Sequence, residues 1–457
     1  MKAIRDAQER GGRLGQWIGL GALVGVACGI ASALFLKALE HATRFRQAHE
    51  LVIYGLPLAG LAVGCLYERW GKTIKGGNNL VLDTIHENTP QIPLRMAPMV
   101  FIGTVLTHVF GGSAGREGTA VQMGASLADW ISHRLRVDTE TRRLLLAAGV
   151  AGGFGSVFGT PIAGAVFGLE VVCIGKIEYD ALAPALVASL VGDYLTRHLG
   201  IVHTAYPRVS FVELAPLVLG KLGLMGVAMA AATVAFVELT HRLKHLLEDK
   251  IRQLSWRMFV GGTAVVIMWK LIGTSDYLGL GVPMILRSFS DPHLPTYAFA
   301  AKIAFTAVTL SSGFLGGEVT PLFFVGASLG SVLARGLGLP IELGAGVGIA
   351  AVFASAANTP LALSIMAVEL LGAAIFPHVV IVSVVAYLLS GHRSIYPAQR
   401  IGRAKHGGAV VPRAVALRDL RDLRDRGTRA WERSSELKSM SATETSDHRP
   451  IKEACHE

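Results

Sequence analysis

Two short glycine-rich stretches of the chain each combine a glutamate with a threonine. Residues 115–119 read GREGT and residues 316–320 read GGEVT, so that Glu117 and Thr119 correspond to Glu318 and Thr320. Glycine lets the backbone turn sharply and approach a ligand closely. A helix that begins at such a turn presents unpaired N–H groups and the positive end of its dipole, which bind an anion without a full positive charge. Each stretch is therefore a candidate anion site.

The two glutamates suit a second task in such a site. An ionised carboxylate competes with the anion for the same N–H groups, and a protonated one withdraws, so one glutamate can be both gate and proton carrier. Charge at membrane depth is costly, which favours a functional role for Glu117 and Glu318. The alternative is that each carboxylate only caps a helix N-terminus.

Further polar side chains extend the candidate site. Asn78 and Asn79 follow two glycines and precede an apolar stretch in KGGNNLVLDTIHE (75–87), which repeats the pattern of a turn before a helix. Tyr396 comes just after the last apolar segment, and its phenol can donate a hydrogen bond. His108 lies inside an apolar segment, where a packed polar role is favoured over a proton relay.

The two halves of the chain resemble each other. Residues 159–171 (GTPIAGAVFGLEV) align without gaps with residues 358–370 (NTPLALSIMAVEL), so that Glu170 pairs with Glu369. The GREGT and GGEVT stretches lie upstream at nearly the same offset, and a GAS triplet follows each. Secondary transporters contain such repeats, commonly inverted, with the site where broken helices of both halves meet. Small-residue helix packing is the alternative; it explains the GAS pair but not the glutamates. Glu170 and Glu369, at the far ends of apolar helices, are expected to pair or to cap.

Composition points to a membrane protein. Of 457 residues, 51% are hydrophobic and only 17% are charged, too few to coat a soluble surface. The net charge of +10 sits at the chain ends and in short loops, which fits cytoplasmic loops better than nucleic-acid binding. Four cysteines without CxxC spacing and scattered histidines predict neither a disulfide framework nor a metal site. No cofactor is expected. An enzyme would need a nucleophile–base pair or a metal cluster, and the sequence contains neither.

The apolar segments predict an all-α polytopic protein with interrupted helices. The first span is Leu14 to Leu36, preceded by basic residues. Further candidates, several of them short or broken by Gly and Pro, are 51–67, 95–112, 117–132, 143–172, 181–196, 212–239, 258–273, 296–315, 320–338, 342–373 and 376–391. Irregular backbone at membrane depth persists only inside protein or beside a water-filled cavity. The pattern is that of a transporter built with half-helices.

These motifs resemble the CLC family of anion channels and proton-coupled anion transporters over about residues 17–400. GSAGREGTAVQMGAS (112–126) looks like the family's GREGP stretch, whose glutamate is the external gate, here Glu117. GGNN (76–79) falls where the family has GSGIP, and SGFLGGEVTPLFFVGASLG (312–330) matches its GxFxP region. Tyr396 lies at the position of the family's central tyrosine. The resemblance implies an inverted-repeat fold and a homodimer with one pathway in each subunit.

The departures from the family pattern resemble its fluoride/proton antiporter branch. Thr119 replaces the usual proline, Asn78 stands at the serine position, and the GxFxP loop carries Glu318 and Thr320. The exchangers' second, inner glutamate is absent, because the pair reads Glu170-Val171. Glu318 is the substitute acid that the branch implies.

Together with this resemblance, the sequence predicts a proton-coupled fluoride exporter that confers fluoride resistance, with fluoride, protons, lipid and a second copy of the chain as partners and no nucleic acid. A passive anion channel and a chloride/proton exchanger of the same fold remain alternatives. Glu117 and Glu318 are assigned to gating and proton transfer. Fluoride is small and strongly hydrated and needs short, strong donors, which are assigned to Asn78, Asn79, Gly118, Thr119, Val319, Thr320 and Tyr396.

The expected organisation has four parts. They are a cytoplasmic N-terminal segment (1–16), a first membrane repeat (17–200), a second repeat with linking helices (201–400) and a charged cytoplasmic tail (401–457). The expected location is the inner membrane of a bacterium, with both termini in the cytoplasm.

Overall fold

Helices make up most of the described chain. The computed structural model describes residues 2–405 and 415–419, so most of the expected tail (401–457) lies outside the described residues. The first half contains α1 (Lys2–Ala48), α2 (Leu56–Trp70), α3 (Asn78–Glu87), α4 (Met96–Val109), α5 (Glu117–Arg134), α6 (Thr139–Phe158), α7 (Pro161–Glu170) and α8 (Leu182–His198). The second half contains α9 (Pro216–Lys250), α10 (Leu254–Ile272), α11 (Val282–Arg287), α12 (Ala298–Ser311), α13 (Val319–Leu337), α14 (Ile341–Ala357), α15 (Pro360–Leu371) and α16 (Phe376–Leu389).

Shorter elements complete the structure. There are four 3₁₀ turns in the described residues: η1 (Glu50–Gly55), η2 (Lys72–Ile74), η3 (Tyr179–Ala181) and η4 (Ala373–Ile375). A small sheet joins β1 (Cys173–Ile174), β2 (Arg400–Ile401) and β3 (Val415–Ala416). β1 pairs in parallel with β2, and β2 pairs antiparallel with β3. The sheet ties the end of α7 to the segment that follows Tyr396.

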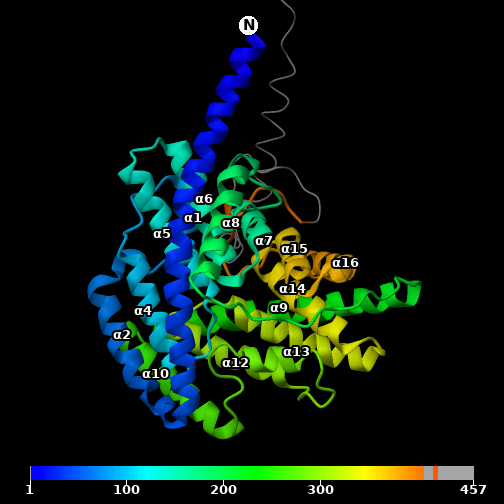
Figure 1. Cartoon of the computed structure of the whole chain (residues 1–457). Coiled ribbons are helices and arrows are strands. Elements are labelled where there is room, and N and C mark those ends of the chain that lie inside the picture. The colour runs from blue at the N-terminus through cyan, green and yellow to red at the C-terminus, as the bar shows by residue number, and fades with distance from the viewer. Residues whose placement is uncertain (1, 406–414, 420–457) are drawn as a thin grey trace, which may run out of the picture.

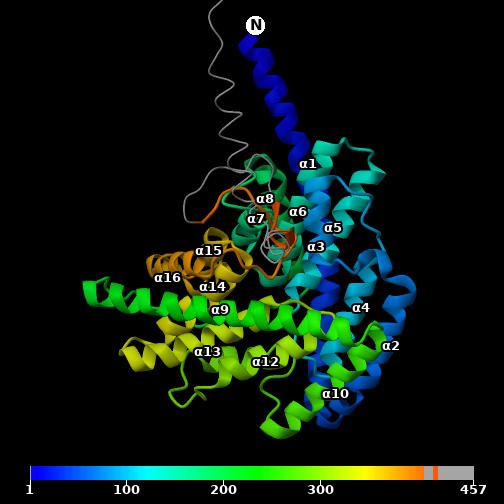
Figure 2. The ribbon, with the colours of Figure 1, turned by 180° about the vertical axis from the view of Figure 1, so that it is seen from behind.

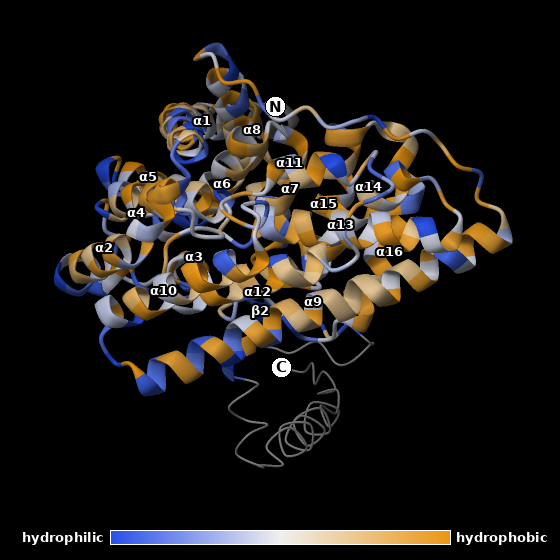
Figure 3. Ribbon diagram, turned by 90° about the horizontal axis from the view of Figure 1, so that it is seen from below, coloured by the Kyte–Doolittle hydropathy of each residue, from blue (hydrophilic) through white to orange (hydrophobic). Residues whose placement is uncertain are grey.

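Only some of the helices are long and apolar enough to cross a membrane alone. Within the described residues these are Leu14–Ala48, Glu50–Trp70, Pro216–Lys250 and Val319–Leu337. Six shorter apolar helices of 10–17 residues accompany them, below the length that a single span needs. Figures 1 and 2 show α1 running steeply along one side while α9 and α13 run across the molecule. Figure 3 shows hydrophobic residues along most of α9 and hydrophilic residues at its end. The prediction of interrupted helices is confirmed.

Two expected spans each contain two helices. The segment 143–172 breaks between α6 and α7, where Gly159 has φ +74° and Pro161 begins the next helix. The segment 342–373 breaks in the same way between α14 and α15, with Asn358 at φ +58° and Pro360. A residue in the left-handed backbone conformation ends a helix. Proline is tolerated in the first turn of the next helix, because an N–H at that position would have no hydrogen-bond partner within the helix. The repeat therefore places a helix break at equivalent points of both halves.

Small residues bring equivalent helix pairs into backbone contact. A Cβ on Gly124 of α5 would lie 2.3 Å from the carbonyl oxygen of Gly149 on α6. In the second half, a Cβ on Gly326 of α13 would lie 2.0 Å from the carbonyl oxygen of Gly348 on α14. Both distances are far below a real carbon–oxygen contact, so only glycine fits. The small-residue packing considered for the GAS triplets is confirmed at these positions.

The two halves also cap each other reciprocally. Glu170, at the end of α7, accepts hydrogen bonds from the N–H groups of Leu361 (3.1 Å) and Ala362 (2.8 Å) at the start of α15. Glu369, near the end of α15, accepts from Ile162 (3.0 Å) and Ala163 (2.8 Å) at the start of α7. Each carboxylate satisfies helix N–H groups that would otherwise lack partners. The structural role expected for this pair of glutamates is confirmed.

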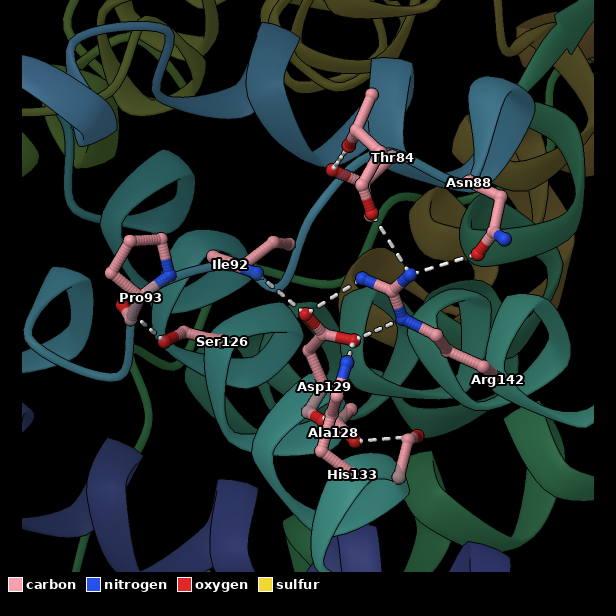
Figure 4. A network of polar contacts seen from close by, with 11 residues as sticks. Thr84, Asn88, Ile92, Pro93, Ser126, Ala128, Asp129, His133 and Arg142 are labelled. Atoms are coloured by element: carbon pink, nitrogen blue, oxygen red, sulfur yellow. Dashed lines mark hydrogen bonds and ion pairs between the residues drawn. The ribbon is translucent and has the colours of Figure 1, made fainter. Parts of the chain in front are cut away.

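A buried ion pair fixes the end of α3. The Asp129 carboxylate accepts from Arg142 Nε (2.6 Å) and Nη2 (3.0 Å) and from the Ile92 N–H (2.6 Å). Arg142 Nη1 also donates to Asn88 Oδ1 and to the Thr89 carbonyl. Figure 4 shows these contacts converging from α5, α6 and the link between α3 and α4. The network holds α3, whose first residue is Asn78, against the α5–α6 pair.

Candidate functional site

The two glycine-rich stretches meet at the N-termini of α5 and α13. The Gly115 N–H donates to the Gly317 carbonyl (2.6 Å), and the Gly317 N–H donates to the Gly115 carbonyl (2.8 Å). A Cβ on Gly317 would lie 2.7 Å from the nitrogen of Gly118, so the backbones are in direct contact. Residues about two hundred positions apart in sequence therefore form one junction, with a helix N-terminus on each side.

Polar residues of α4 and α12 hold the first of these stretches. The Ser113 hydroxyl lies 3.0 Å from the Thr306 hydroxyl, and the Ser113 N–H donates to Thr309 Oγ1 (3.1 Å). His108 lies between two carbonyl oxygens, 2.8 Å from that of Thr104 and 3.1 Å from that of Ala114. These contacts fix the loop that leads into Glu117.

Glu117 is the first residue of α5, and its side chain is held by both stretches. Its carboxylate accepts from the Thr320 hydroxyl (2.5 Å), from the Thr320 N–H (3.2 Å) and from the Arg116 N–H (3.1 Å). Arg116 Nε lies 3.5 Å from Glu117 Oε1. The Glu117 side chain is only 1% exposed. The carboxylate thus occupies hydroxyl and N–H donors that an anion could otherwise use. The N–H groups that it occupies belong to Arg116 and Thr320. They are not those of Gly118, Thr119 or Val319, for which the sequence predicts anion binding.

The two threonines of the repeat have different partners. Thr320 lies in the first turn of α13 and donates to Glu117, whereas the Thr119 hydroxyl lies 2.7 Å from the Thr104 hydroxyl on α4. Both side chains are buried. Thr119 therefore joins two helices, and only Thr320 touches the carboxylate.

Asn78 faces the same junction from α3. A Cβ on Gly118 would lie 3.0 Å from Asn78 Nδ2, so the amide reaches the first turn of α5. Asn78 Oδ1 is buried and has no hydrogen-bond partner. Asn78 and Tyr396 line one cavity of about 10 Å³, together with Val81, Leu82, Val121, Val150, Phe167 and Val171. That volume holds about one water molecule.

Asn79 has a different position from its neighbour. Its Oδ1 accepts from the Ala398 N–H (2.9 Å), two residues beyond Tyr396. The Tyr396 N–H donates to Ser394 Oγ (3.0 Å), and its carbonyl accepts from the Gln399 N–H. Asn79 therefore holds the segment that positions Tyr396.

Glu318 and Val319 lie at the start of α13. Glu318 is the N-cap residue and is partly buried, and Val319 is the first helical residue and fully buried. Glu318 directly precedes α13, two residues before Thr320, and Tyr396 lines the cavity that Asn78 also lines. The structure thus brings together Glu117, Glu318, Thr320, Asn78 and Tyr396.

Sequence reasoning missed two features of this junction. Arg116 contacts Glu117 with both its backbone and its guanidinium, and its place beside the glutamate in GREGT was the available signal. The cavity residue Phe167 belongs to a cluster of five phenylalanine rings in stacked, tilted or edge-on contact. Its members are Phe154, Phe158, Phe167, Phe323 and Phe353. Phe154 and Phe353 occupy equivalent repeat positions, which a closer alignment of the halves would have shown.

Comparison with known proteins decides the family. The family model described as voltage gated chloride channel matches residues 59–391, most of the chain. The chain belongs to the voltage-gated chloride channel family. The resemblance to this family is confirmed.

Individual members of the voltage-gated chloride channel family add detail. The chain is 45% identical over 430 residues to a protein of Pseudomonas syringae pv. tomato named chloride/fluoride channel protein, covering 93% of this chain and 95% of that one. A crystal structure of a CLC-type fluoride/proton antiporter aligns with a TM-score of 0.83 at 38% identity, covering 85% and 98% of the two chains. A slow cyanobacterial Cl⁻/H⁺ antiporter aligns with a TM-score of 0.71 at 18% identity and shows the shared fold.

Proposed function

We propose that the protein is a fluoride/proton antiporter that exports fluoride and so confers fluoride resistance. The observation that carries the proposal is the contact of Glu117 with Thr320 across the junction, two residues after Glu318. The likeness to a solved fluoride/proton antiporter over nearly all of that chain supports it.

Glu117 acts as gate and proton carrier in this proposal. Ionised, its carboxylate occupies the Thr320 hydroxyl and N–H and the Arg116 N–H, so an anion cannot take those donors. A proton removes the charge that makes these hydrogen bonds strong. The side chain then withdraws, and the donors become available to fluoride. The anion and the ionised carboxylate thus compete for the same donors, and protonation of Glu117 decides between them, which couples the movement of the two ions.

Glu318 supplies the second acid, in place of the inner glutamate that the Glu170-Val171 pair lacks. It lies at the N-terminus of α13, two residues before Thr320, and is partly buried. In the proposed cycle it passes the proton between Glu117 and the interior, or it binds beside the ion. Glu170 takes no part, because its carboxylate is engaged by two N–H groups of α15.

The central donors favour a small anion. Asn78, with its amide beside Gly118, and Tyr396 line a cavity the size of one water molecule. Fluoride fits such a space and must exchange its hydration for short hydrogen bonds. Thr320 adds a hydroxyl once Glu117 withdraws. Asn79 and Thr119 support the site by holding the Tyr396 segment and α4.

Two other functions fit the same fold. A passive anion channel is favoured by the missing inner glutamate and disfavoured by the acid at Glu318. A chloride/proton exchanger is disfavoured by Asn78 and Thr119, where the family has serine and proline. The comparison protein from Pseudomonas syringae carries both anions in its name, which keeps chloride as the competing substrate.

Ion movement from liposomes that contain the purified protein separates these functions. Fluoride and pH electrodes record the same sample, and chloride efflux is measured in parallel. The proposal expects fluoride efflux with proton uptake and little chloride movement. Equal chloride movement would support the exchanger, and fluoride efflux without protons would support the channel.

The same proposal includes the assembly and location. We infer a homodimer in the inner membrane of a bacterium, with both termini in the cytoplasm. Basic residues before Leu14 support the orientation of the first span. Cross-linking in membranes tests the dimer, and labelling of cysteines placed at either end of α1 tests the orientation.

A further inference from the structure

Residues 415–418, near the end of the described chain, form a strap along the segment that follows Tyr396. Within this strap, β3 pairs antiparallel with β2. The Leu417 N–H donates to the Gln399 carbonyl (3.0 Å), and the Arg418 N–H donates to the carbonyl of the residue directly after Tyr396 (3.0 Å). The Leu417 side chain is buried. The strap is therefore bonded to the segment that positions Tyr396.

The side chain of Arg418 extends from the strap to α3. Its Nη1 donates to Asp83 Oδ2 (2.9 Å), and its Nη2 donates to Asp83 Oδ1 (3.0 Å). Arg400, in β2, donates to Glu87 on the same helix, and its Nη2 lies 3.6 Å from Asp83 Oδ1. The first residue of α3 is Asn78. The strap thus joins the helix of one cavity residue, Asn78, to the segment of the other, Tyr396.

The ion pair of Asp83 and Arg418 is stronger than an ordinary surface pair. A single exposed pair contributes little to stability, because water screens it and both side chains lose freedom. Here two parallel hydrogen bonds fix the geometry, and a second arginine shares the carboxylate. The Asp83 side chain is only 17% exposed, against 44% for Arg418. The pair can therefore hold α3 in place.

Other contacts show which part would move without the pair. Gln399 Nε2 donates to the carbonyl oxygens of Val171 and Ala357, at 2.9 Å each, so it ties the Tyr396 segment to both halves of the repeat. The far end of α3 is held by the contact of Asn88 with Arg142 (Figure 4). Loss of the strap contact therefore leaves the Tyr396 segment anchored and frees the first turns of α3.

We propose that the ion pair of Asp83 and Arg418 is a latch that sets the distance between Asn78 and Tyr396, and that both its members are positioning residues for the selection of a small anion. With the latch closed, the cavity keeps its volume of about 10 Å³, the size of one water molecule. With the latch broken, the first turn of α3 moves away from Tyr396, and the cavity admits a larger halide. The inference rests on the proposed function, because it concerns the selectivity of the same cavity.

The ratio of fluoride efflux to chloride efflux tests the latch in liposomes that contain Arg418→Gln. This substitution removes the paired N–H groups and the charge, and it leaves the backbone hydrogen bonds of the strap in place. We expect the ratio to fall about fivefold, the factor that corresponds to a lost ion pair of this exposure. Lower stability alone would reduce both fluxes in proportion and leave the ratio as it is. An unchanged ratio would overturn the latch.

Two further variants show whether the pair acts as a unit. Asp83→Asn should lower the ratio as much as Arg418→Gln, and the double variant should lower it no further, because each change removes the same contact. Arg287→Gln is the matched control, since Arg287 is 49% exposed and its Nη2 donates to Asp291 Oδ2 at 2.7 Å. Its ratio should equal that of the unsubstituted protein. An equal fall in Arg287→Gln, or effects that multiply in the double variant, would overturn the assignment.

Hydrogen–deuterium exchange measured by mass spectrometry examines the latch without transport. In Arg418→Gln, peptides that cover α3 and residues 415–418 should exchange faster than in the unsubstituted protein, because the contact that joins them is lost. Exchange as slow as in the unsubstituted protein would overturn the latch. Equal movement of fluoride and chloride by the unsubstituted protein would instead contradict the proposed function, and the exchange rates would still decide whether Asp83 and Arg418 hold α3.

Discussion

Replacement of Glu117 by glutamine tests the gate most directly. The carboxylate accepts three hydrogen bonds, at 2.5, 3.2 and 3.1 Å, and lies 3.5 Å from Arg116 Nε. A hydrogen bond to a charged group contributes about 1.5–3 kcal/mol and a neutral one about 0.5–1.5 kcal/mol. Loss of the charge therefore weakens each bond by about 1 kcal/mol and the closed position by about 3 kcal/mol in total. That change shifts the closed-to-open ratio by on the order of 100-fold.

The expected result in liposomes is fluoride efflux that no longer carries protons. The fluoride rate of Glu117→Gln should change little with pH, because the side chain that titrates is gone. Under a pH gradient its reversal potential should follow fluoride alone. The assay uses fluoride and pH electrodes on the same vesicles, with the rate measured at several external pH values.

Glu170→Gln is the matched control. Glu170 is another mostly buried carboxylate that accepts from two N–H groups, at 3.1 and 2.8 Å, but it lies at the α15 cap. The Glu170→Gln substitution should lower the stability of the protein and leave proton coupling unchanged. Proton uptake that stays coupled to fluoride in Glu117→Gln, or that disappears equally in Glu170→Gln, would refute the reasoning about the gate.

The remaining predictions concern packing, capping and the tyrosine segment. Gly326→Ala should lower the free energy of unfolding by about 1–3 kcal/mol, because its Cβ would lie 2.0 Å from a carbonyl oxygen. Gly336→Ala on the same helix has open space around its Cβ and should leave the free energy of unfolding unchanged. Equal thermal midpoints of the two variants would contradict this prediction. Glu369→Ala should lower the free energy of unfolding by about 2–4 kcal/mol, because two hydrogen bonds to N–H groups are lost. The loss should appear as a lower thermal midpoint in detergent. An unchanged midpoint would argue against the reciprocal caps. Asn79→Ala should reduce fluoride efflux about tenfold, since leaving the Ala398 N–H unpaired costs about 1–3 kcal/mol and displaces Tyr396. Efflux equal to that of the unsubstituted protein would show that the Tyr396 segment keeps its position without Asn79.

Much of the fold was predictable because local chemistry specifies it. Glycine or asparagine followed by Thr-Pro ends one helix and begins another, and the sequence contains this pattern at 159–161 and 358–360. The break cannot be bypassed, because proline lacks the N–H that a continuous helix needs. Hydropathy alone nevertheless predicts single segments at 143–172 and 342–373, since the apolar character does not change across either break.

The partners of individual side chains were less predictable. Asn78 and Asn79 are adjacent and chemically identical, yet one faces Gly118 and the other holds Ala398. Thr119 and Thr320 are equivalent in the repeat, yet only Thr320 meets Glu117. Such differences depend on which helix packs behind each residue, and one sequence does not specify that.

The sequence alone determined that this is a helical membrane protein made of two related halves, with an acid inside a glycine-rich turn of each. These conclusions follow from local properties: apolar length, backbone freedom and the spacing of motifs. Only the tertiary structure decided that the turns contact each other and that Glu117 reaches across to Thr320. The reason is physical, because contacts between residues far apart in the chain arise from the packing of whole helices, in which glycines at Gly124 and Gly326 set how closely the backbones approach.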